Sequence, residues 1–262
     1  MLNKTAISLL LTFLAVPFAS SQEGESFRSR QFAFPRVRVA AKEKDEVLSG
    51  RFAQERLHYP PNSIFLRAFK KEGLLELWVA DSPSKGYSLE HTYRICTSSG
   101  TLGPKRRYGD EQVPEGFYTL DWFNPQSNFY LSLHISYPSG SDRILCSHKN
   151  PGGDIFLHGN CASIGCIPIT DDGIKEVYWL AVLARTAGEK EIPIEIFPAR
   201  LSDEGFKALE ASNPGRPDLM AFWGNLKTGY DYFEKKHRLP RVRVGGDGSY
   251  EFLDEITAGG KR

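Results

Sequence analysis

Net charge is nearly absent from this chain. Across 262 residues, 33 Lys and Arg offset 32 Asp and Glu, which leaves a formal charge of +1. A protein that binds polyanions through its overall field carries a large positive excess, so nucleic acid is not an expected partner. One local basic cluster, Lys105 to Arg107, is more typical of a solvated loop than of an anion site.

Long apolar runs are scarce as well. The main one, Ala6 to Phe18, is short for a membrane span and follows a charged start at Lys4. Ala19 and Ser21 then suit the −3 and −1 positions of a signal-peptidase site, and no cysteine follows the run to carry a lipid. We expect residues 1–21 to be a cleaved signal peptide and the protein to be exported to the periplasm or cell envelope. An N-terminal membrane anchor is the alternative.

Cysteine is limited to four positions. They are Cys96, Cys146, Cys161 and Cys166. In an exported protein cysteines usually pair, and four of them allow three full pairings, among which the sequence does not choose.

The composition contains no sign of disorder. Hydrophobic residues make up 40% of the chain, with 24 Gly and 16 Pro, which favours a globular protein rich in strands and loops. Without the signal peptide about 240 residues remain, enough for one main domain. We place it at 64–200, between an N-terminal extension (22–63) and a helical C-terminal extension (201–262). The word Pro-Arg-Val-Arg-Val occurs within both 34–39 and 239–244, either by chance or as two similar edge strands.

Apolar and polar residues alternate through much of the main domain, between clusters of Gly, Pro, Ser and Asp. This pattern predicts strands at 64–69, 74–80, 87–95, 117–123, 129–137, 143–147, 155–157 and 192–197. Helical spacing, with Thr170 as N-cap and Gly188 as stop, predicts a helix between them. Two more helices are expected, at 202–211 and from Pro217 onward.

The stretch from Asp154 to Asp172, DIFLHGNCASIGCIPITDD, combines the parts of a reactive site. A short apolar strand ends on His158, and a turn-prone segment then carries Cys161 and Cys166 before the helix begins. A thiol, an imidazole and clustered backbone N–H groups in such a place are the components of nucleophilic acyl transfer. A neighbouring imidazole can lower a thiol's pKa and deliver a proton to the leaving amine.

The residues of this stretch resemble a known family of catalytic domains. His-Gly at 158–159 followed by Ser-Ile-Gly-Cys at 163–166, with GDEQVPEGFY at 109–118 upstream, resembles the L,D-transpeptidase catalytic domain family (YkuD-like), most closely its YafK-like murein-acting branch. The similarity runs from about residue 74 to 197. It implies a mainly β (α+β) fold, an L,D-transpeptidase-like β-sandwich over 64–200 with a helix after the nucleophile and a helical C-terminal extension.

The resemblance also implies the chemistry. Cys166 is the expected nucleophile and His158 its general base, while the backbone N–H groups of Gly165 and Cys166 bind the oxyanion. Substrate contacts are assigned to Ser136, Tyr137, Gly159 and Ser163. The implied reaction is L,D-transpeptidation of peptidoglycan stem peptides through a Cys166 thioacyl-enzyme, and no metal or other cofactor is implied. Because the nucleophile must stay reduced, at least one more cysteine should remain a thiol.

Two departures from the family leave the second half-reaction open. Ile164 stands where the common Ser-His-Gly-Cys word has its second histidine, and Pro168 replaces a residue that is often polar. The acyl group then passes either to an amine of another stem peptide or wall-attached protein, or to water. The second outcome makes an L,D-amidase that hydrolyses the same linkage and releases wall-bound protein. A non-catalytic peptidoglycan-binding protein is the alternative from another class.

The role of Cys161 stays open between a disulfide with Cys166, a thiol near the nucleophile and simple space filling. His148, His158, Cys161 and Cys166 also offer the donor types of a zinc site. Their spacing matches no standard finger, however, and a ligated thiolate would be blocked as a nucleophile. We therefore favour the catalytic interpretation, with no metal.

Overall fold

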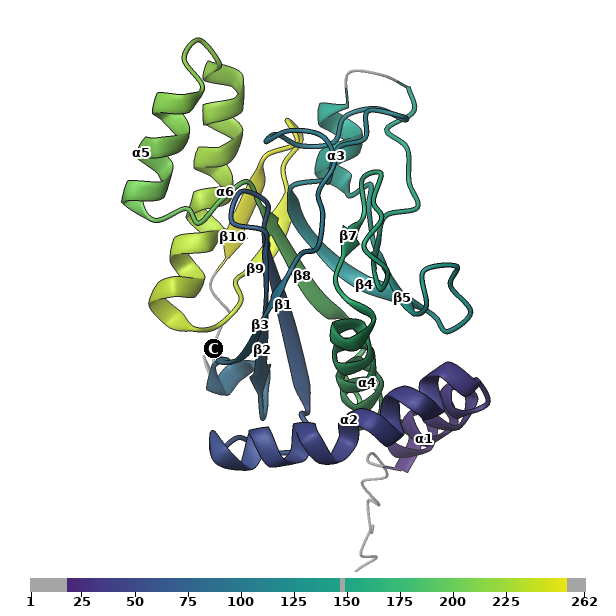
Figure 1. Ribbon diagram of the computed structural model, residues 1–262. Helices are drawn as coiled ribbons and strands as arrows, with labels where there is room; N and C mark the ends of the chain where they lie inside the picture. The colour runs from purple at the N-terminus through teal and green to yellow at the C-terminus, as the bar shows by residue number, and fades with distance from the viewer. Residues whose placement is uncertain (1–17, 147–148, 254–262) are drawn as a thin grey trace, which may run out of the picture.

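The computed structural model of this protein describes residues 18–146 and 149–253. Eight strands form one mixed sheet in the order β3-β2-β1-β8-β4-β5-β6-β7 (Figure 1). They are β1 (Ser63–Phe69), β2 (Leu74–Ala80), β3 (Ser88–Arg94), β4 (Gly116–Asn124), β5 (Ser132–Ile135), β6 (Phe156–His158), β7 (Ile167–Pro168) and β8 (Ile192–Phe197). β8 runs parallel to β1 and β7 parallel to β6, while the other neighbours are antiparallel.

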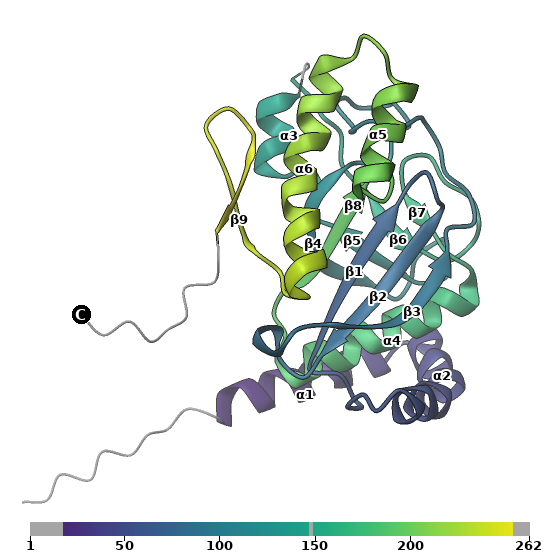
Figure 2. The same cartoon turned by 90° about the vertical axis from the view of Figure 1, so that its left-hand side faces the viewer.

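Helices cover both faces of the sheet (Figure 2). The helices are α1 (Phe18–Phe32), α2 (Pro35–Gln54), α3 (Gly140–Leu145), α4 (Asp171–Ala187), α5 (Asp203–Ser212) and α6 (Pro217–Lys236), with a 3-10 turn at Pro83–Lys85. α4 packs on one face with α1 and α2 beyond it, whereas α5 and α6 cover the other face. The expected α+β class, with a helix after the nucleophile and a helical C-terminal extension, is confirmed.

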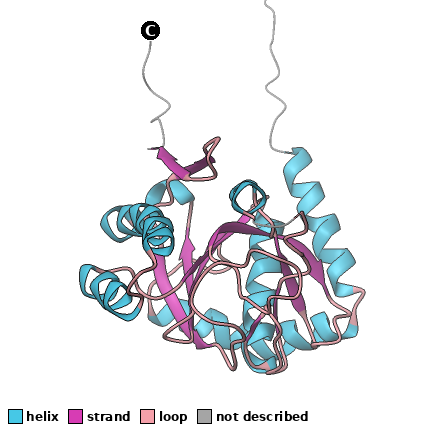
Figure 3. Cartoon of the chain, turned by 90° about the horizontal axis from the view of Figure 1, so that it is seen from above, coloured by secondary structure: helices cyan, strands magenta, loops and turns pink. Residues whose placement is uncertain are grey.

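The sheet curls until its two edges meet. Seen from above, the strands curve through the middle of the molecule with helices outside them (Figure 3). β3 and β7 are the two edge strands, yet the N–H of Cys96, just beyond β3, donates to the carbonyl of Pro168 in β7 at 2.9 Å. The stretch from Asp154 to Asp172 therefore lies where the two edges come together.

Helix α4 forms as the sequence predicts. The side chain of Thr170 accepts the N–H of Gly173 at 3.1 Å and so caps the first turn, where Asp171 and Asp172 complement the helix dipole. Gly188 ends the helix in the left-handed conformation, with φ 109°. The helix is buried along most of its length against apolar side chains of the sheet, so it fixes the strands on either side of the nucleophile.

The two Pro-Arg-Val-Arg-Val words adopt different structures. The second is a strand, β9 (Arg241–Val244), paired with β10 (Tyr250–Leu253), whereas the first begins helix α2. The alternative that 34–39 and 239–244 are two similar edge strands is therefore wrong. Proline suits the first turn of a helix, and Val37 is fully buried together with later residues at helical spacing, namely Ala40, Ala41, Lys44, Leu48 and Phe52.

A second expectation is also wrong, because 143–147 is not a strand. Residues 140–145 form helix α3, which begins with a reciprocal capping box between Ser139 and Asp142. Residue 147 lies outside the described part of the chain, as does His148.

The N-terminal expectation falls mostly outside the described residues. Only positions 18–21 of the expected signal peptide are included, as the first residues of α1. Within the described ranges, no helix combines the length and apolar character needed to cross a membrane.

Candidate active site

His158 and Cys166 lie on the same face of neighbouring strands. β6 and β7 pair so that Leu157 is opposite Ile167 and His158 is opposite Pro168. Leu157 and Ile167 point into the core beside α4, and because side chains alternate along a strand, His158 and Cys166 point to the other face. The Sγ of Cys166 accepts the backbone N–H of Phe156 at 3.4 Å, which places the thiol beside β6.

The imidazole of His158 is held in one orientation. Its Nδ1 donates to the carbonyl of Gly159 at 2.5 Å, so the proton sits on Nδ1 and Nε2 carries the lone pair. Only 1% of His158 is exposed, and the ring of Phe129 packs on it with centroids 4.6 Å apart. Nε2 is buried and makes no hydrogen bond to any described residue. A buried acceptor without a partner is costly in a resting protein and is typical of a functional group.

Burial controls the protonation of both groups. It lowers the pKa of His158 below its ordinary value of 6.5, an effect that the Gly159 carbonyl partly offsets. Burial also raises the pKa of the Cys166 thiol above its ordinary 9.0, against the Phe156 N–H, which lowers it. At neutral pH the site therefore contains a neutral thiol and a neutral imidazole. The sequence led us to expect a thiol pKa lowered by the imidazole, and the resting site shows the opposite direction.

The thiol and the base are not hydrogen-bonded to each other in this state. Among the described residues, the thiol donates to the carbonyl of Asp154, with Sγ to O at 3.7 Å. Catalytic contacts often tighten only when substrate binds, so the geometry is compatible with a base acting on this thiol.

The turn before Cys166 requires glycine. Gly165 has φ 101°, and a Cβ there would approach the carbonyl of Gln112 to 3.1 Å. The hydroxyl of Ser163 donates to the carbonyl of Cys166 at 2.7 Å, which stabilises the turn. The N–H of Gly165 donates to Oγ of Ser99 at 2.7 Å. This expected oxyanion donor is therefore already bound to a hydroxyl, which a substrate oxygen would have to replace.

The expected substrate contacts have structural roles in this state. Oγ of Ser136 accepts the N–H of Thr119 at 2.9 Å, and the buried Tyr137 hydroxyl donates to the carbonyl of Pro151 at 2.9 Å. A Cβ on Gly159 would lie 2.6 Å from the carboxylate of Asp171, so only glycine fits beside the base. Their contact with substrate stays a prediction.

One disulfide, Cys96–Cys161, joins the chain after β3 to the catalytic stretch. Cys161 is thus neither paired with Cys166 nor available as a zinc ligand, and both of those alternatives are wrong. Cys146 and Cys166 are both thiols. The expectation that at least one cysteine in addition to Cys166 remains a thiol is therefore confirmed. Within the described ranges, no cluster of His, Cys, Asp and Glu has the geometry to hold a metal ion.

Sequence reasoning missed three residues of neighbouring strands that share the sheet face of Cys166. Trp122, His134 and Phe156 are cross-strand neighbours on the face that carries Cys166, and Trp122 is 53% exposed. Their rings are in contact, with centroids 5.0 Å apart for His134 and Phe156 and 5.9 Å for Trp122 and Phe156. Alternation marks them as outward-facing, but only the order of the strands in the sheet reveals that they lead to Cys166.

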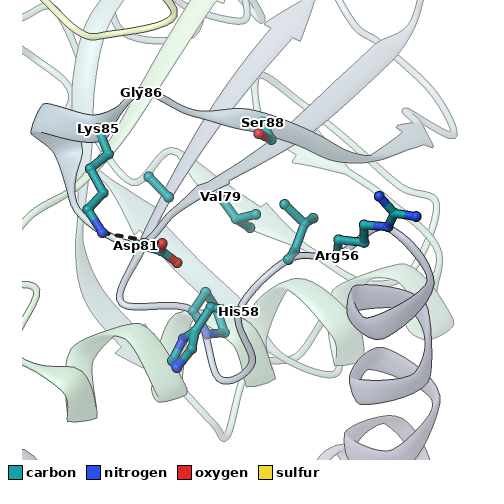
Figure 4. A pocket seen from close by; sticks show the side chains of 10 residues that line it. Arg56, His58, Val79, Asp81, Lys85, Gly86 and Ser88 are labelled. Carbon is teal, nitrogen blue, oxygen red and sulfur yellow. Dashed lines mark ion pairs between the residues drawn. The ribbon is translucent and has the colours of Figure 1, made fainter.

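One open cavity, of about 710 Å³, adjoins the candidate site and is lined by Asn160, Cys161 and Asp171 among others. Other cavities lie elsewhere. One of about 480 Å³ is lined by Arg56, His58 and Asp81, and Figure 4 shows Asp81 paired with Lys85 at 3.6 Å. It lies near the start of β1, whereas Ala68 near the end of β1 lines the small space beside Cys166. Cys166 therefore lies near the opposite end of β1 from the 480 Å³ cavity.

Comparison with known proteins identifies close relatives by sequence. The chain is 37% identical over 183 residues to the Escherichia coli K12 protein named "Putative L,D-transpeptidase YafK", a match that covers 69% of this chain and 70% of that protein. The protein of the same name from Escherichia coli O157:H7 matches equally. No family model matches the chain.

Solved structures are more distant. The helical cell shape determining protein Pgp2 from Campylobacter jejuni is 16% identical with a TM-score of 0.41, over 70% of this chain and 73% of that one. L,D-transpeptidase 1 of Mycobacterium tuberculosis is 16% identical with a TM-score of 0.28, over 51% of this chain and 61% of that one.

Proposed function

This chain belongs to the L,D-transpeptidase family, and from that premise we propose that it catalyses cysteine-dependent acyl transfer on peptidoglycan stem peptides. The observation that carries the proposal is Nε2 of His158, which is buried without a partner on the strand face that also bears Cys166. A non-catalytic binding protein has no need for such a base beside a thiol.

The first half-reaction uses both groups. Nε2 of His158 takes the proton of the Cys166 thiol, and the resulting thiolate attacks the carbonyl carbon of the third residue of the stem peptide. The carbonyl oxygen becomes an oxyanion, which the N–H groups of Gly165 and Cys166 bind once Ser99 gives up its hydrogen bond. The protonated His158 then gives its proton to the departing amine of the terminal D-amino acid. The product is a thioester on Cys166.

The second half-reaction decides between a transferase and a hydrolase. An acceptor amine from another stem peptide or a wall-attached protein attacks the thioester in the first case, and water attacks it in the second. His158 acts as base in both, because Nε2 is unprotonated again after the leaving amine has taken its proton. We propose transfer as the main reaction and hydrolysis as its alternative.

We further propose that the protein acts outside the cytoplasm after cleavage of residues 1–21. The disulfide between Cys96 and Cys161 supports this, since disulfides persist in oxidising compartments. The catalytic unit is proposed to span 64–200, with the residues beyond 200 packed on its sheet.

The test is mass spectrometry of purified muropeptides incubated with the wild type and with Cys166→Ala. New cross-links or exchanged terminal D-amino acids that the variant fails to make establish a transpeptidase. Shortened peptides without new bonds, also lost in the variant, establish a hydrolase. Identical products from both proteins would reject an enzymatic role for Cys166 and favour a peptidoglycan-binding protein.

A further inference from the structure

The proposed nucleophile directly precedes a weakly supported strand. β7 contains only Ile167 and Pro168, and within the sheet it pairs with β6 alone. A two-residue edge strand on one neighbour offers few bonds to fix the residues before it. Gly165 and Cys166, which must be placed accurately for acyl transfer, are those residues.

Three bonds from the opposite edge of the sheet supply the missing support. The disulfide joins Cys96 to Cys161, the N–H of Cys96 donates to the carbonyl of Pro168 at 2.9 Å, and Oγ of Ser99 accepts the N–H of Gly165 at 2.7 Å. We call residues 96–99 the strap. Because it follows β3, which is the far edge strand, the strap closes the curled sheet at the nucleophile.

The strap touches the site on both sides of the thiol. Its disulfide is anchored five residues before Cys166, and its backbone bond lies two residues after it. Ser98, next to Ser99, lines a small enclosed space of about 10 Å³ together with Cys166 and Ile167. A covalent bond between positions 65 residues apart in the sequence fixes this arrangement more firmly than the two hydrogen bonds alone.

We propose that Cys96 and Cys161 are positioning residues for the acyl-transfer reaction: their disulfide holds Gly165 and Cys166 where an oxyanion can be bound. The inference rests on the proposed function. Activity would then require Cys166 to be a reduced thiol while Cys96 and Cys161 are joined as a disulfide. When a dithiol reagent reduces the bond, two electrons and two protons pass to Cys96 and Cys161, which become thiols, while the reagent closes to its own disulfide.

Two reagents separate positioning from simple folding. Iodoacetamide alkylates a thiolate by displacement at carbon and creates no oxyanion, whereas a carbapenem acylates Cys166 through a tetrahedral oxyanion. Their rates are measured on the wild type and on Cys96→Ser/Cys161→Ser, with the modified residue mapped by mass spectrometry. Cys146→Ser is the matched control, since it makes the same chemical change at a cysteine outside the disulfide.

In the double variant, acylation should fall by at least about tenfold, while alkylation of Cys166 changes by less than about threefold. The control should match the wild type in both rates. Equal acylation rates in the double variant and the wild type would overturn the proposal. A parallel fall of the acylation and alkylation rates, in proportion to the loss of thermal stability, would also overturn it. If the wild type itself is not acylated, the acyl-transfer function fails, and the positioning role fails with it.

Reduction of the wild type gives a second route that does not depend on folding of the double variant. Cys161 is exposed, so dithiothreitol can reach the bond in the native protein. After removal of the reagent without air, acylation should be slowed selectively, and reoxidation should restore it. Undiminished acylation of the protein, with the bond shown by mass to be open, would overturn the proposal.

Discussion

Trp223 of helix α6 donates its indole N–H to the buried carboxylate of Glu115 at 2.7 Å. The same carboxylate pairs with the ammonium of Lys70 at 2.8 Å and accepts the N–H of Gly103 at 2.8 Å. Glu115 belongs to the Pro-Glu-Gly-Phe-Tyr motif and follows Gln112, whose carbonyl lies against Gly165. The C-terminal extension is thereby tied to the loop beside the nucleophile.

Glu115→Ala should therefore lower the free energy of unfolding by about 3–5 kcal/mol, because it leaves the Lys70 ammonium buried without its carboxylate. Urea unfolding measures this directly. Glu210→Ala, an exposed glutamate on α5, is the control and should change stability by less than about 0.5 kcal/mol. A small, equal effect of both substitutions would show that the buried pair does not support the fold.

The pH dependence of Cys166 follows from the two shifted pKa values. Because burial raises the thiol's pKa above 9.0, alkylation of Cys166 at pH 7.5 should be slower than that of free glutathione and should rise beyond pH 9. Because the pKa of His158 is lowered below 6.5, acylation should stay constant from about pH 6.5 to pH 9 and decline only below that range. An alkylation rate that is already maximal at pH 6.5 would instead indicate a thiolate–imidazolium pair.

His158→Ala distinguishes the role of His158 as a general base from the effect of burial on the thiol of Cys166. Acylation by a carbapenem should fall by about 10²–10⁴-fold, since the proposed general base is removed. The pH profile of alkylation should change little, because burial and not the imidazole sets the thiol's pKa. Loss of both reactions to the same extent would place His158 in the structure rather than in the chemistry.

A buried carboxyl beneath α6 should make stability depend on pH. Burial raises the pKa of Glu195 from 4.5 to about 8, with Arg67 acting in the opposite direction. Its contribution is fully present below pH 4.5 and is lost as pH rises through 8, at a slope on the order of 1 kcal/mol per pH unit. Glu195→Gln should flatten the fall in thermal stability between pH 6 and pH 9, and an unchanged slope would contradict this.

The two Pro-Arg-Val-Arg-Val words offer a matched pair of substitutions. Val37 is fully buried in α2, whereas Val242 is only partly buried in the β9–β10 ribbon. Val37→Ala should cost about 2 kcal/mol of unfolding free energy, and Val242→Ala less than about 1 kcal/mol. Similar losses at both sites in chemical denaturation would contradict the assignment of Val37 to the core.

These two words also show what a sequence reveals and what it does not. Alternation located most strands, and the capping pattern from Thr170 to Gly188 located α4, because both are local signals. The first Pro-Arg-Val-Arg-Val was misassigned because its helix is defined by residues up to Phe52, which lie beyond the word. Residues 143–147 were misassigned for a similar reason, since Ser139 and Asp142 start a helix before the apolar run begins.

The residues of the candidate site also fall into two groups, those marked by a local sequence pattern and those that depend on tertiary contacts. His158 and Cys166 are close in sequence and carry a specific motif, so the chain alone was enough to propose them. Ser99 and the partner of Cys161 depend on the curl of the sheet, which brings its two edges together, and no local pattern encodes that contact. The direction of the thiol's pKa shift depends on burial, which the sequence also did not show.

Cys166 is proposed to form a thioester with the stem peptide. The most direct measurement is intact-protein mass spectrometry after rapid acid quench of the enzyme mixed with a tetrapeptide muropeptide. We predict an adduct on Cys166 with the mass of the substrate less its terminal D-amino acid, and no such adduct on Cys166→Ala. Product formation that persists in Cys166→Ala, with no adduct on the wild type, would contradict it.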